Sequence, residues 1–301
     1  MQGGVRRFRL VLITASVAVA VTAVRAGPDA PALTIGVAAR LMRPRPGELV
    51  VLTLTLTAAP TSVAVHVFGR AMPSYPLRPG VWQSLVGIDL DQKPGAYTVA
   101  VDARVAETMV HGEEALVVRP RTFATRRLRV DPDFVNPSGP VLARIASEAA
   151  FVRGVSDGSA QERLWSAPFL RPVPDPANSR FGTRSIFNGE RRRPHGGADF
   201  LSAAGTPVHA PNAGRVVAAR DLFFTGNTVI IDHGLGVVSL LAHLASIDVH
   251  EGDTVLAGQI VGRVGATGRV TGPHLHWALT VAGARVDPLS ALALIGDSTG
   301  R

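Results

Sequence analysis

The sequence of 301 residues contains no cysteine, and this absence removes several classes of chemistry. The chain cannot form disulfide bonds, use a thiolate as metal ligand or nucleophile, or carry the cysteine of a lipoprotein anchor. Lysine is nearly absent as well, since Lys93 is the only one, and almost all the positive charge is arginine. A metal site in this chain would therefore be built from nitrogen and oxygen ligands.

Charged residues make up only 18% of the chain, whereas 46% of the residues are hydrophobic, as in a globular protein with ample core. The length predicts about two domains. No basic tract is interleaved with aromatic residues, so no nucleic acid is expected as a partner. The formal charge of +8 becomes +4 when the four arginines of residues 1–26 are removed, a mild charge that suits an anionic polymer such as a cell wall.

The first 26 residues have the pattern of a secretory signal peptide. Their basic start is formed by Arg6, Arg7 and Arg9. An uncharged stretch follows over residues 10–24, and Val24 and Ala26 are the small residues of a cleavage site. The stretch is short for a membrane-spanning helix, which needs about 20 apolar residues. We expect cleavage after Ala26 and export to the periplasm or cell envelope; the alternative is an uncleaved anchor, the one segment for which membrane contact is expected.

Residues 27–135 are predicted to form an immunoglobulin-like β-sandwich. Short runs alternate as strands do, among them "ELVVLTLTLTA", "SVAVHVFG", "GAYTVAV" and "TRRLRV". Pro-Gly turn signals at residues 79–80 and 94–95 separate them at the spacing of an antiparallel sandwich. His66 falls within one run and His111 adjoins Gly112 in a predicted turn, and neither is expected to have a catalytic role.

The remaining chain is predicted to hold a helical linker and a second β-domain. Residues 136–165 are rich in alanine with apolar residues near helical spacing, which indicates one helix and a loop. Residues 166–295 return to short strands with glycine-rich turns, as in "NTVIIDHG", "GVVSLLAHL" and "GQIVGRVG". This domain is expected to be antiparallel β, followed by a disordered tail over 296–301. The predicted fold class is mainly β, with no signal for a particular oligomeric state.

Five polar residues of the second domain need an explanation. "RPHGGADF" places His195 four residues before Asp199, and the Gly-Gly pair between them disfavours a helix but lets the backbone curl so that both side chains converge. In "TGPHLHWAL", strand alternation puts His274 and His276 on one face. His243 comes at the end of the apolar strand "SLLAHL".

Two histidines and one carboxylate, with a fourth position open to water, are the composition of a catalytic zinc site. Zinc is the natural candidate for nitrogen and oxygen ligands, with one ion per chain, although copper, cobalt or nickel would accept the same set. Each motif alone is also explained by structural hydrogen bonding, and His243 alone by burial in a core.

A sequence resemblance narrows these alternatives. "RPHGGADF", "GTPVHAPNAGRV", "GNTVIIDHGLGVVSLLAHL", "GDTVLAGQIVGRVGATGRVTGPHLHWAL" and "VDPL" occur in this order. They resemble the LytM/lysostaphin-type (M23) peptidoglycan metalloendopeptidases over essentially all of residues 166–290. "VGIDLDQKPGAY" also resembles the β-sandwich ahead of this domain in bacterial envelope members of the family.

The resemblance implies a site and a reaction. His195, Asp199 and His276 correspond to the family's zinc ligands, and His243 and His274 to its unliganded active-site histidines. The implied reaction is hydrolysis of a peptide bond in the stem or cross-link of peptidoglycan by metal-activated water. The two unliganded histidines would deprotonate that water and hydrogen-bond the oxyanion, in an order that the sequence does not assign.

Three other interpretations are weighed. A catalytically silent regulator that activates another cell-wall hydrolase would be expected to lack zinc ligands, and all five site positions are present. A lipoyl- or biotinyl-type carrier needs a lysine at a hairpin tip, but Lys93 lies in the other domain. A cupin-like oxygenase would require a glutamate a few residues after His276, and "HWALTVAGARVDP" contains none.

Several further positions also carry expectations. Leu241 stands where many relatives of the family have a tyrosine, which would alter substrate contacts. Asn188 and residues 191–193 are expected either to meet substrate carboxylates or to form a solvated basic loop. The other histidines of the second domain are expected to be structural or at the surface: His209, His233 and His250.

Overall fold

The computed structural model describes residues 32–39, 44–129, 139–166, 168–179, 181–191 and 193–295. The predicted signal peptide and the predicted C-terminal tail lie outside these residues. Within them, no helix is long and apolar enough to span a membrane.

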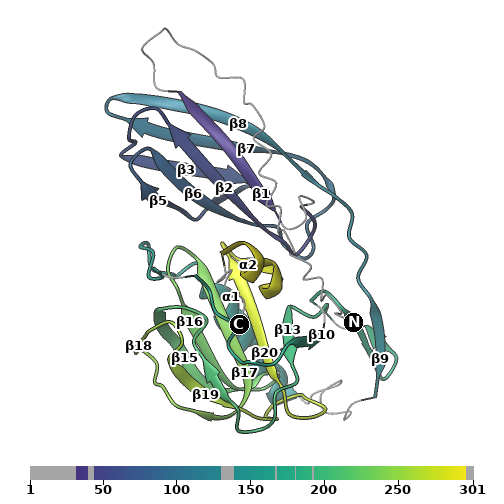
Figure 1. The fold of residues 1–301 in the computed structure, drawn as a ribbon. Helices are drawn as coiled ribbons and strands as arrows, with labels where there is room; N and C mark the ends of the chain where they lie inside the picture. Colours follow the sequence, from purple (N-terminus) through teal and green to yellow (C-terminus); the bar gives the residue numbers. More distant parts are fainter. Residues whose placement is uncertain are drawn as a thin grey trace, which may run out of the picture.

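The N-terminal part consists of two four-stranded antiparallel sheets that pack face to face (Figure 1). The first has the order β1-β2-β6-β5, with bounds Leu33–Ala39, Leu49–Leu56, Val81–Gly87 and Ser74–Arg78. The second has the order β4-β3-β7-β8, with bounds Arg70–Met72, Ser62–Val67, Gly95–Val105 and Thr108–Val118. Inward-facing residues of both sheets, including Leu52, Val86, Val65 and Val101, share one hydrophobic core.

Two expectations for this region were wrong. His111 does not lie in a turn; it pairs with Asp102 within the β7–β8 ladder, where its Nδ1 is 2.6 Å from Oδ1 of Asp102. The run "TRRLRV" does not join either sheet of the sandwich. Its strand β9 (Thr125–Leu128) instead pairs in parallel with β11 (Arg184–Phe187), which also pairs with the two-residue strand β12 (Glu190–Arg191).

The C-terminal part is built on a ten-stranded sheet system, in agreement with the predicted mainly β class. Its main path has the order β10-β13-β20-β17-β16-β15-β18, with bounds Ala177–Ser179, Gly197–Phe200, Leu275–Val281, Val237–Ile247, Gly226–Asp232, Gly214–Leu222 and Thr254–Val255. Off this path, β19 (Ile260–Val264) pairs with both β14 (Pro207–His209) and β17, and β21 (Ala284–Val286) pairs with β20. All these pairings are antiparallel.

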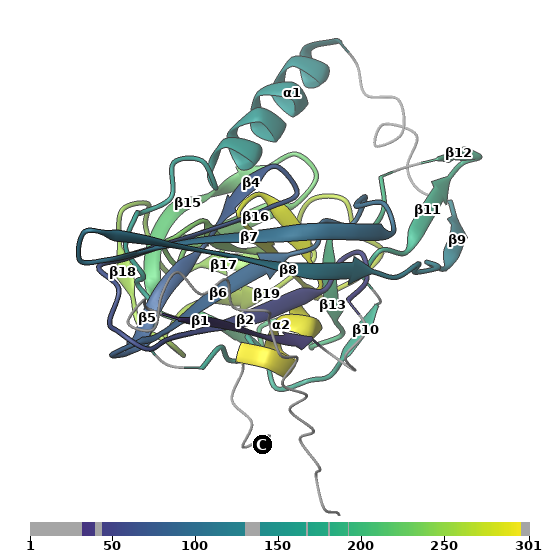
Figure 2. The same ribbon diagram turned by 90° about the horizontal axis from the view of Figure 1, so that it is seen from above.

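The predicted helix in the linker is confirmed as α1 (Gly139–Gly154). It projects beside the C-terminal sheet (Figure 2), and Phe151 and Val152 pack against Ala218 and Ile230. A second helix, α2 (Pro288–Ile295), was not predicted. It does carry a local signal, because Asp287 accepts a hydrogen bond from the Leu289 N–H as an N-cap and proline occupies the first helical position.

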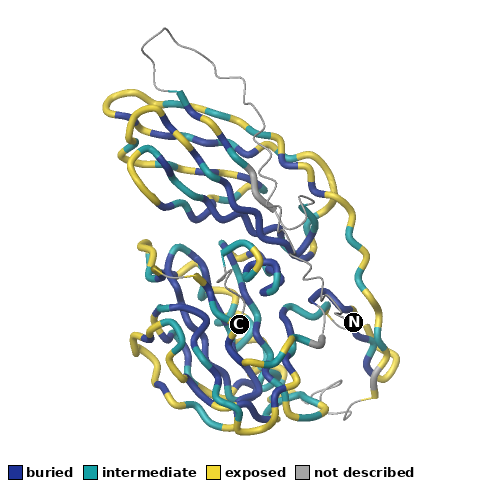
Figure 3. The backbone as a smooth tube through the Cα atoms, viewed as in Figure 1, coloured by how far each residue is buried: buried dark blue, intermediate teal, exposed yellow. Residues whose placement is uncertain are grey.

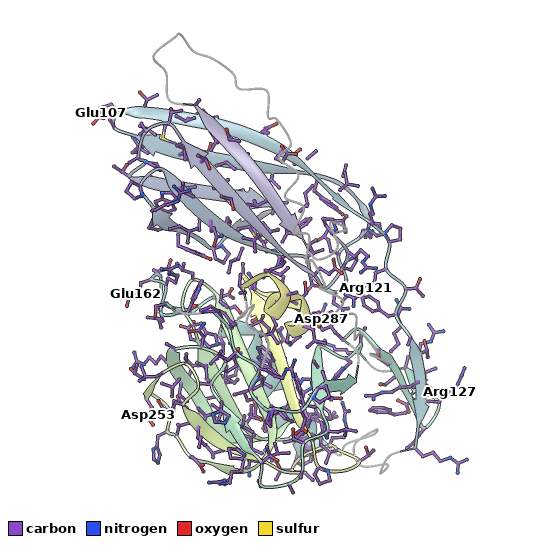
Figure 4. All side chains as sticks on the ribbon, in the orientation of Figure 1. Glu107, Arg121, Arg127, Glu162, Asp253 and Asp287 are labelled. Carbon is purple, nitrogen blue, oxygen red and sulfur yellow. The ribbon has the colours of Figure 1, made fainter. Side chains whose placement is uncertain are left out.

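The two parts share a third core at the level of α2, where buried positions from both meet (Figure 3). Leu49 and Tyr75 from the sandwich pack there with Trp165, Phe169 and Leu279. The connector after β8 runs down the side of the C-terminal part, and Arg121 reaches the Asp287 carboxylate at 3.4 Å beside α2 (Figure 4). The sandwich is therefore packed directly onto the end of the C-terminal sheet that carries α2 and β21.

Candidate metal centre

Strand pairing places the first two candidate ligands side by side. Asp199 of β13 and His276 of β20 are register partners, so their side chains emerge on the same face of the sheet. His276 Nδ1 lies 2.8 Å from Asp199 Oδ1. The neighbouring residues Ala198 and Trp277 turn into the core on the opposite face, where both are fully buried.

The third candidate, His195, comes from the segment that leads into β13. Its backbone is held on both sides, because its N–H donates to the Thr183 carbonyl and its own carbonyl accepts the Gly182 N–H. The side chain then turns back toward the strand, so that His195 Nε2 lies 2.9 Å from Asp199 Oδ1 and 3.0 Å from His276 Nδ1.

Gly197 explains how β13 and β20 approach so closely at this point. A Cβ at Gly197 would collide with the Trp277 carbonyl oxygen and lie 2.8 Å from Cε1 of the His276 ring. A side chain at this position would therefore displace the ligand candidate itself. At Gly196, by contrast, an added Cβ would meet no atom within 4 Å.

The chemistry of this donor set fits a divalent cation. The ligand atoms of His195, Asp199 and His276 all lie within 4.8 Å of one another, and only 11%, 13% and 14% of their side chains is exposed. An ionised carboxylate oxygen and the lone pairs of neutral imidazoles are all acceptors, so their convergence is favourable only around protons or a cation. Two nitrogens and one carboxylate oxygen are ligands that zinc accepts.

The electrostatics favour the forms that bind metal. Burial alone would raise the pKa of Asp199, but hydrogen bonds from His195 and His276 hold the pKa of this carboxyl far below its usual range. Burial lowers the pKa of His276 below its ordinary value, against the opposing effect of Asp199. An ionised Asp199 and a neutral His276 are the protonation states that a metal requires.

His243 and His274 flank this set. Their rings lie 4.8 Å apart between centroids, and the His243 ring lies 6.0 Å from that of His276. His243 is not at the end of its strand as expected. It lies within β17 next to a register shift, with a φ of 65°, an uncommon backbone conformation for a residue other than glycine. This break in alternation turns the imidazole toward the site.

Backbone carbonyls define the tautomer of both flanking histidines. Nδ1 of His243 lies 2.9 Å from the Thr267 carbonyl oxygen, and Nδ1 of His274 lies 2.9 Å from that of Gly272. A carbonyl only accepts hydrogen bonds, so each Nδ1 carries the proton and each neutral ring keeps a lone pair on Nε2. Nε2 of His274 lies 3.9 Å from Asp199 Oδ1, on the side of the ligand set.

Burial and the nearby His276 lower the pKa of His243 to about 3. The ring is therefore neutral at pH 7, with its lone pair on Nε2.

One loop supplies both of these carbonyls. The segment 265–272 is bonded to the β16–β17 region through the Thr267 hydroxyl, which donates to the Leu244 carbonyl and accepts the Asn227 N–H. The sequence did not reveal this function of Thr267 and Gly272, because a backbone acceptor has no side-chain signature.

The structure also places Leu241 and the remaining histidines of the C-terminal part. Leu241 is fully buried in the core beside its register partner Trp277, so it does not lie where it would contact a substrate. His233 is fully buried between the Ala213 carbonyl and the Ser239 hydroxyl. His209 bonds the Gly258 carbonyl, and His250 is almost fully exposed.

A family model and a solved structure both match this chain to the same peptidase family. The sequence model of peptidase family M23 matches residues 193–288. A crystal structure from Pseudomonas aeruginosa, described as a peptidase M23, is 32% identical, covers 84% of this chain and 96% of its own, and superimposes with a TM-score of 0.66.

Curated relatives match about a third of this chain. The peptidoglycan DD-endopeptidase ShyA of Vibrio cholerae is 42% identical over 115 residues, which are 38% of this chain and 27% of that protein. The DD-carboxypeptidase/endopeptidase Mpg of Neisseria meningitidis is 42% identical over 98 residues, 33% of this chain and 23% of that protein. The chain thus spans about a quarter of the length of these relatives.

Proposed function

Because the chain belongs to peptidase family M23, we propose that it is a zinc-dependent endopeptidase that hydrolyses peptide bonds in the stems or cross-links of peptidoglycan. The names of the relatives ShyA and Mpg support the substrate and the reaction class. The observation that carries the proposal is the convergence of His195, Asp199 and His276 within 3.0 Å, beside two further imidazoles.

In this proposal His195, Asp199 and His276 would hold one Zn²⁺. Bound there, the ion supplies a Lewis acid that polarises a carbonyl and lowers the pKa of water to about 7. Asp199 contributes the negative charge of the ligand set, and its pKa, held far below the usual range, means that this carboxyl is already ionised before it binds a metal.

His243 and His274 handle protons in this mechanism. Each keeps Nδ1–H on a backbone carbonyl and has Nε2 available to accept the proton of the attacking water. A ring protonated in this way becomes a donor at Nε2, able to hydrogen-bond the oxyanion of the tetrahedral intermediate or to protonate the leaving amine. The fixed tautomers avoid a reorientation at the moment of reaction.

The proposed location follows from the substrate. Peptidoglycan lies outside the cytoplasmic membrane, so the enzyme must be exported to the periplasm or cell envelope. The signal-like pattern of residues 1–26 supports this proposal.

Digestion of purified peptidoglycan tests the function. The full chain loaded with zinc should release fragments whose masses, determined by mass spectrometry, identify a newly hydrolysed peptide bond. A chelator should stop the release, and added zinc should restore it. If the protein retains no zinc and releases no fragments, the proposal is wrong and the silent regulator becomes the better explanation.

A further inference from the structure

A small three-stranded sheet, β12-β11-β9, stands at the outer edge of the molecule (Figure 2). Two parts of the chain form it, because β9 comes from the connector that follows the sandwich, while β11 and β12 directly precede His195. Asn188 and Gly189 join β11 to β12 with positive φ values of 51° and 92°, as a two-residue hairpin turn requires.

The register separates the residues of this sheet into two faces. Ser185 and Phe187 are buried on the inner face, where the Arg126 side chain also donates to the Ser185 hydroxyl at 3.0 Å. The opposite face carries Arg127 and Arg191, which are both register partners of Ile186.

Arg184 belongs to that outward face as well, since it lies two residues before Ile186 in β11. Arg127, Arg184 and Arg191 are all exposed. Figure 4 shows Arg127 at the margin of the structure, on β9. We call Arg127, Arg184 and Arg191 the arginine face.

No described acidic side chain neutralises the arginine face, whereas other exposed arginines do have partners. Arg220 pairs with Glu251 and Arg144 with Asp221, each at 2.7 Å. Residues 121–129 and 181–193 contain one acidic residue, Glu190, which lies on the inner-face register beside Phe187. Arg129 and Arg193 add exposed positive charge just beyond the strands.

The fold gains no stability from this arrangement. Neighbouring strands are about 4.8 Å apart, so Arg127 and Arg191 are about 10 Å apart across Ile186. Like charges that are close on one sheet face repel each other, and no partner within the described residues compensates. A surface of this kind is suited to an anionic ligand with several charges, since guanidinium groups bind carboxylates in a bidentate manner.

The arginine face is connected to the metal centre through the backbone. Thr183, next to Arg184, accepts the hydrogen bond from the His195 N–H. Arg191 precedes His195 by four residues, which limits the separation of their Cα atoms to roughly 14 Å. A peptide bound with its scissile bond at the metal centre can therefore extend onto this face.

We propose that the arginine face binds carboxylates of the peptidoglycan peptide, away from the bond that is cut. This inference rests on the proposed function and adds to it a second contact with substrate. Since β9 provides Arg127 and completes the sheet, the connector from the sandwich would take part directly in substrate binding.

Co-sedimentation with purified peptidoglycan sacculi tests this inference. All proteins are full chains loaded with zinc, and all carry His243→Ala so that the sacculi stay intact. The test variant adds Arg127→Gln, Arg184→Gln and Arg191→Gln. The control variant adds Arg78→Gln, Arg104→Gln and Arg215→Gln, which removes the same charge from exposed positions on β5, β7 and β15. Zinc content and thermal unfolding verify that each variant is folded.

The expected result is binding about tenfold weaker for the test variant, with a smaller dependence on salt, and unchanged binding for the control. Sacculi whose carboxylates have been amidated should bind the parent protein as weakly as native sacculi bind the test variant. Equal binding by test and control variants, or full binding to amidated sacculi, would overturn the inference.

Vesicles containing an anionic phospholipid are the other arm of the test. If the test variant loses binding to these vesicles but not to sacculi, the arginine face binds a membrane surface and the inference is wrong. Since binding is measured without cleavage, its failure is separate from failure of the proposed function, which the release of fragments reports.

Discussion

Asp199 and His276 face each other across two paired strands, and their side chains meet at 2.8 Å. Their neighbours Ala198 and Trp277 occupy the hydrophobic core on the other face. A shift of either strand by one residue would bury the polar pair and expose the core residues, so packing of the core also fixes the geometry of the site. The candidate metal centre is thus built on an antiparallel ladder inside the C-terminal sheet.

Removal of the His243 imidazole should separate catalysis from metal binding. His243 lies outside the ligand set and keeps its Nδ1 proton on the Thr267 carbonyl. We expect His243→Ala to retain zinc while kcat falls about 10²–10⁴-fold, the usual contribution of a general acid or base. Zinc content and the rate of fragment release are measured on the same preparation. Loss of the metal in this variant would show that the assigned role is wrong.

Two adjacent glycines provide a matched pair of variants. Gly197→Ala places a methyl group against the Trp277 carbonyl and the His276 ring, so we expect a loss of about 1–3 kcal/mol in the free energy of unfolding and weaker zinc binding. Gly196→Ala meets open space and should change stability by less than about 1 kcal/mol. Denaturant unfolding and zinc titration measure both effects. Equal changes in unfolding free energy and in zinc binding for the two variants would contradict the close approach of β13 and β20.

Stability should depend on pH through His233. Burial lowers the pKa of this imidazole from 6.5 to about 4. Between these values the unfolded chain binds a proton that the folded chain does not, so the free energy of unfolding falls as the pH decreases from 6.5 to 4. The total contribution is about 3 kcal/mol.

Denaturant unfolding at several pH values, with His233→Gln as the comparison, measures this contribution. The variant should show a smaller dependence on pH over the same window. If the free energy of unfolding changes with pH by the same amount in both proteins, His233 is not the source of this pH dependence. NMR of the ring nitrogens should also find the proton on Nδ1, which faces the Ala213 carbonyl.

The contact between the sandwich and the C-terminal part offers a second matched pair. Asp89 receives hydrogen bonds from the Arg285 backbone and from its guanidinium, whereas Asp91 makes one contact with the same guanidinium and its side chain is 71% exposed. We expect Asp89→Ala to lower the free energy of unfolding by about 1–3 kcal/mol and Asp91→Ala by less than about 1 kcal/mol. A larger effect at Asp91 would mean that this ion pair does not join the two parts as described.

Much of the strand pattern could be predicted, because period-two alternation reports local burial. The pairing of β9 with β11 could not, since a strand's partner depends on contacts between residues about 60 positions apart. The eight-residue helix α2 is too short for a clear helical period, although Asp287-Pro288 marks its start.

In the candidate site, the residue types could be predicted from the sequence, whereas the backbone conformation that orients them could not. Residue types and the family resemblance pointed to His195, Asp199 and His276, and the structure brings these three together. The direction of His243 depends on an irregular backbone conformation in β17, which alternation cannot reveal. Leu241, two residues earlier, keeps the regular register opposite Trp277 and lies in the core, so the replacement of the family's tyrosine was not resolved by alternation alone.

The number of zinc ions bound by the full chain tests the central claim most directly. Titration with Zn²⁺ in competition with a chelator should give one tightly bound equivalent per chain for the unaltered protein and none for a variant carrying His276→Ala. Absence of tight binding in the unaltered protein, or an undiminished equivalent in the variant, would contradict the assignment of His195, Asp199 and His276 as a metal centre.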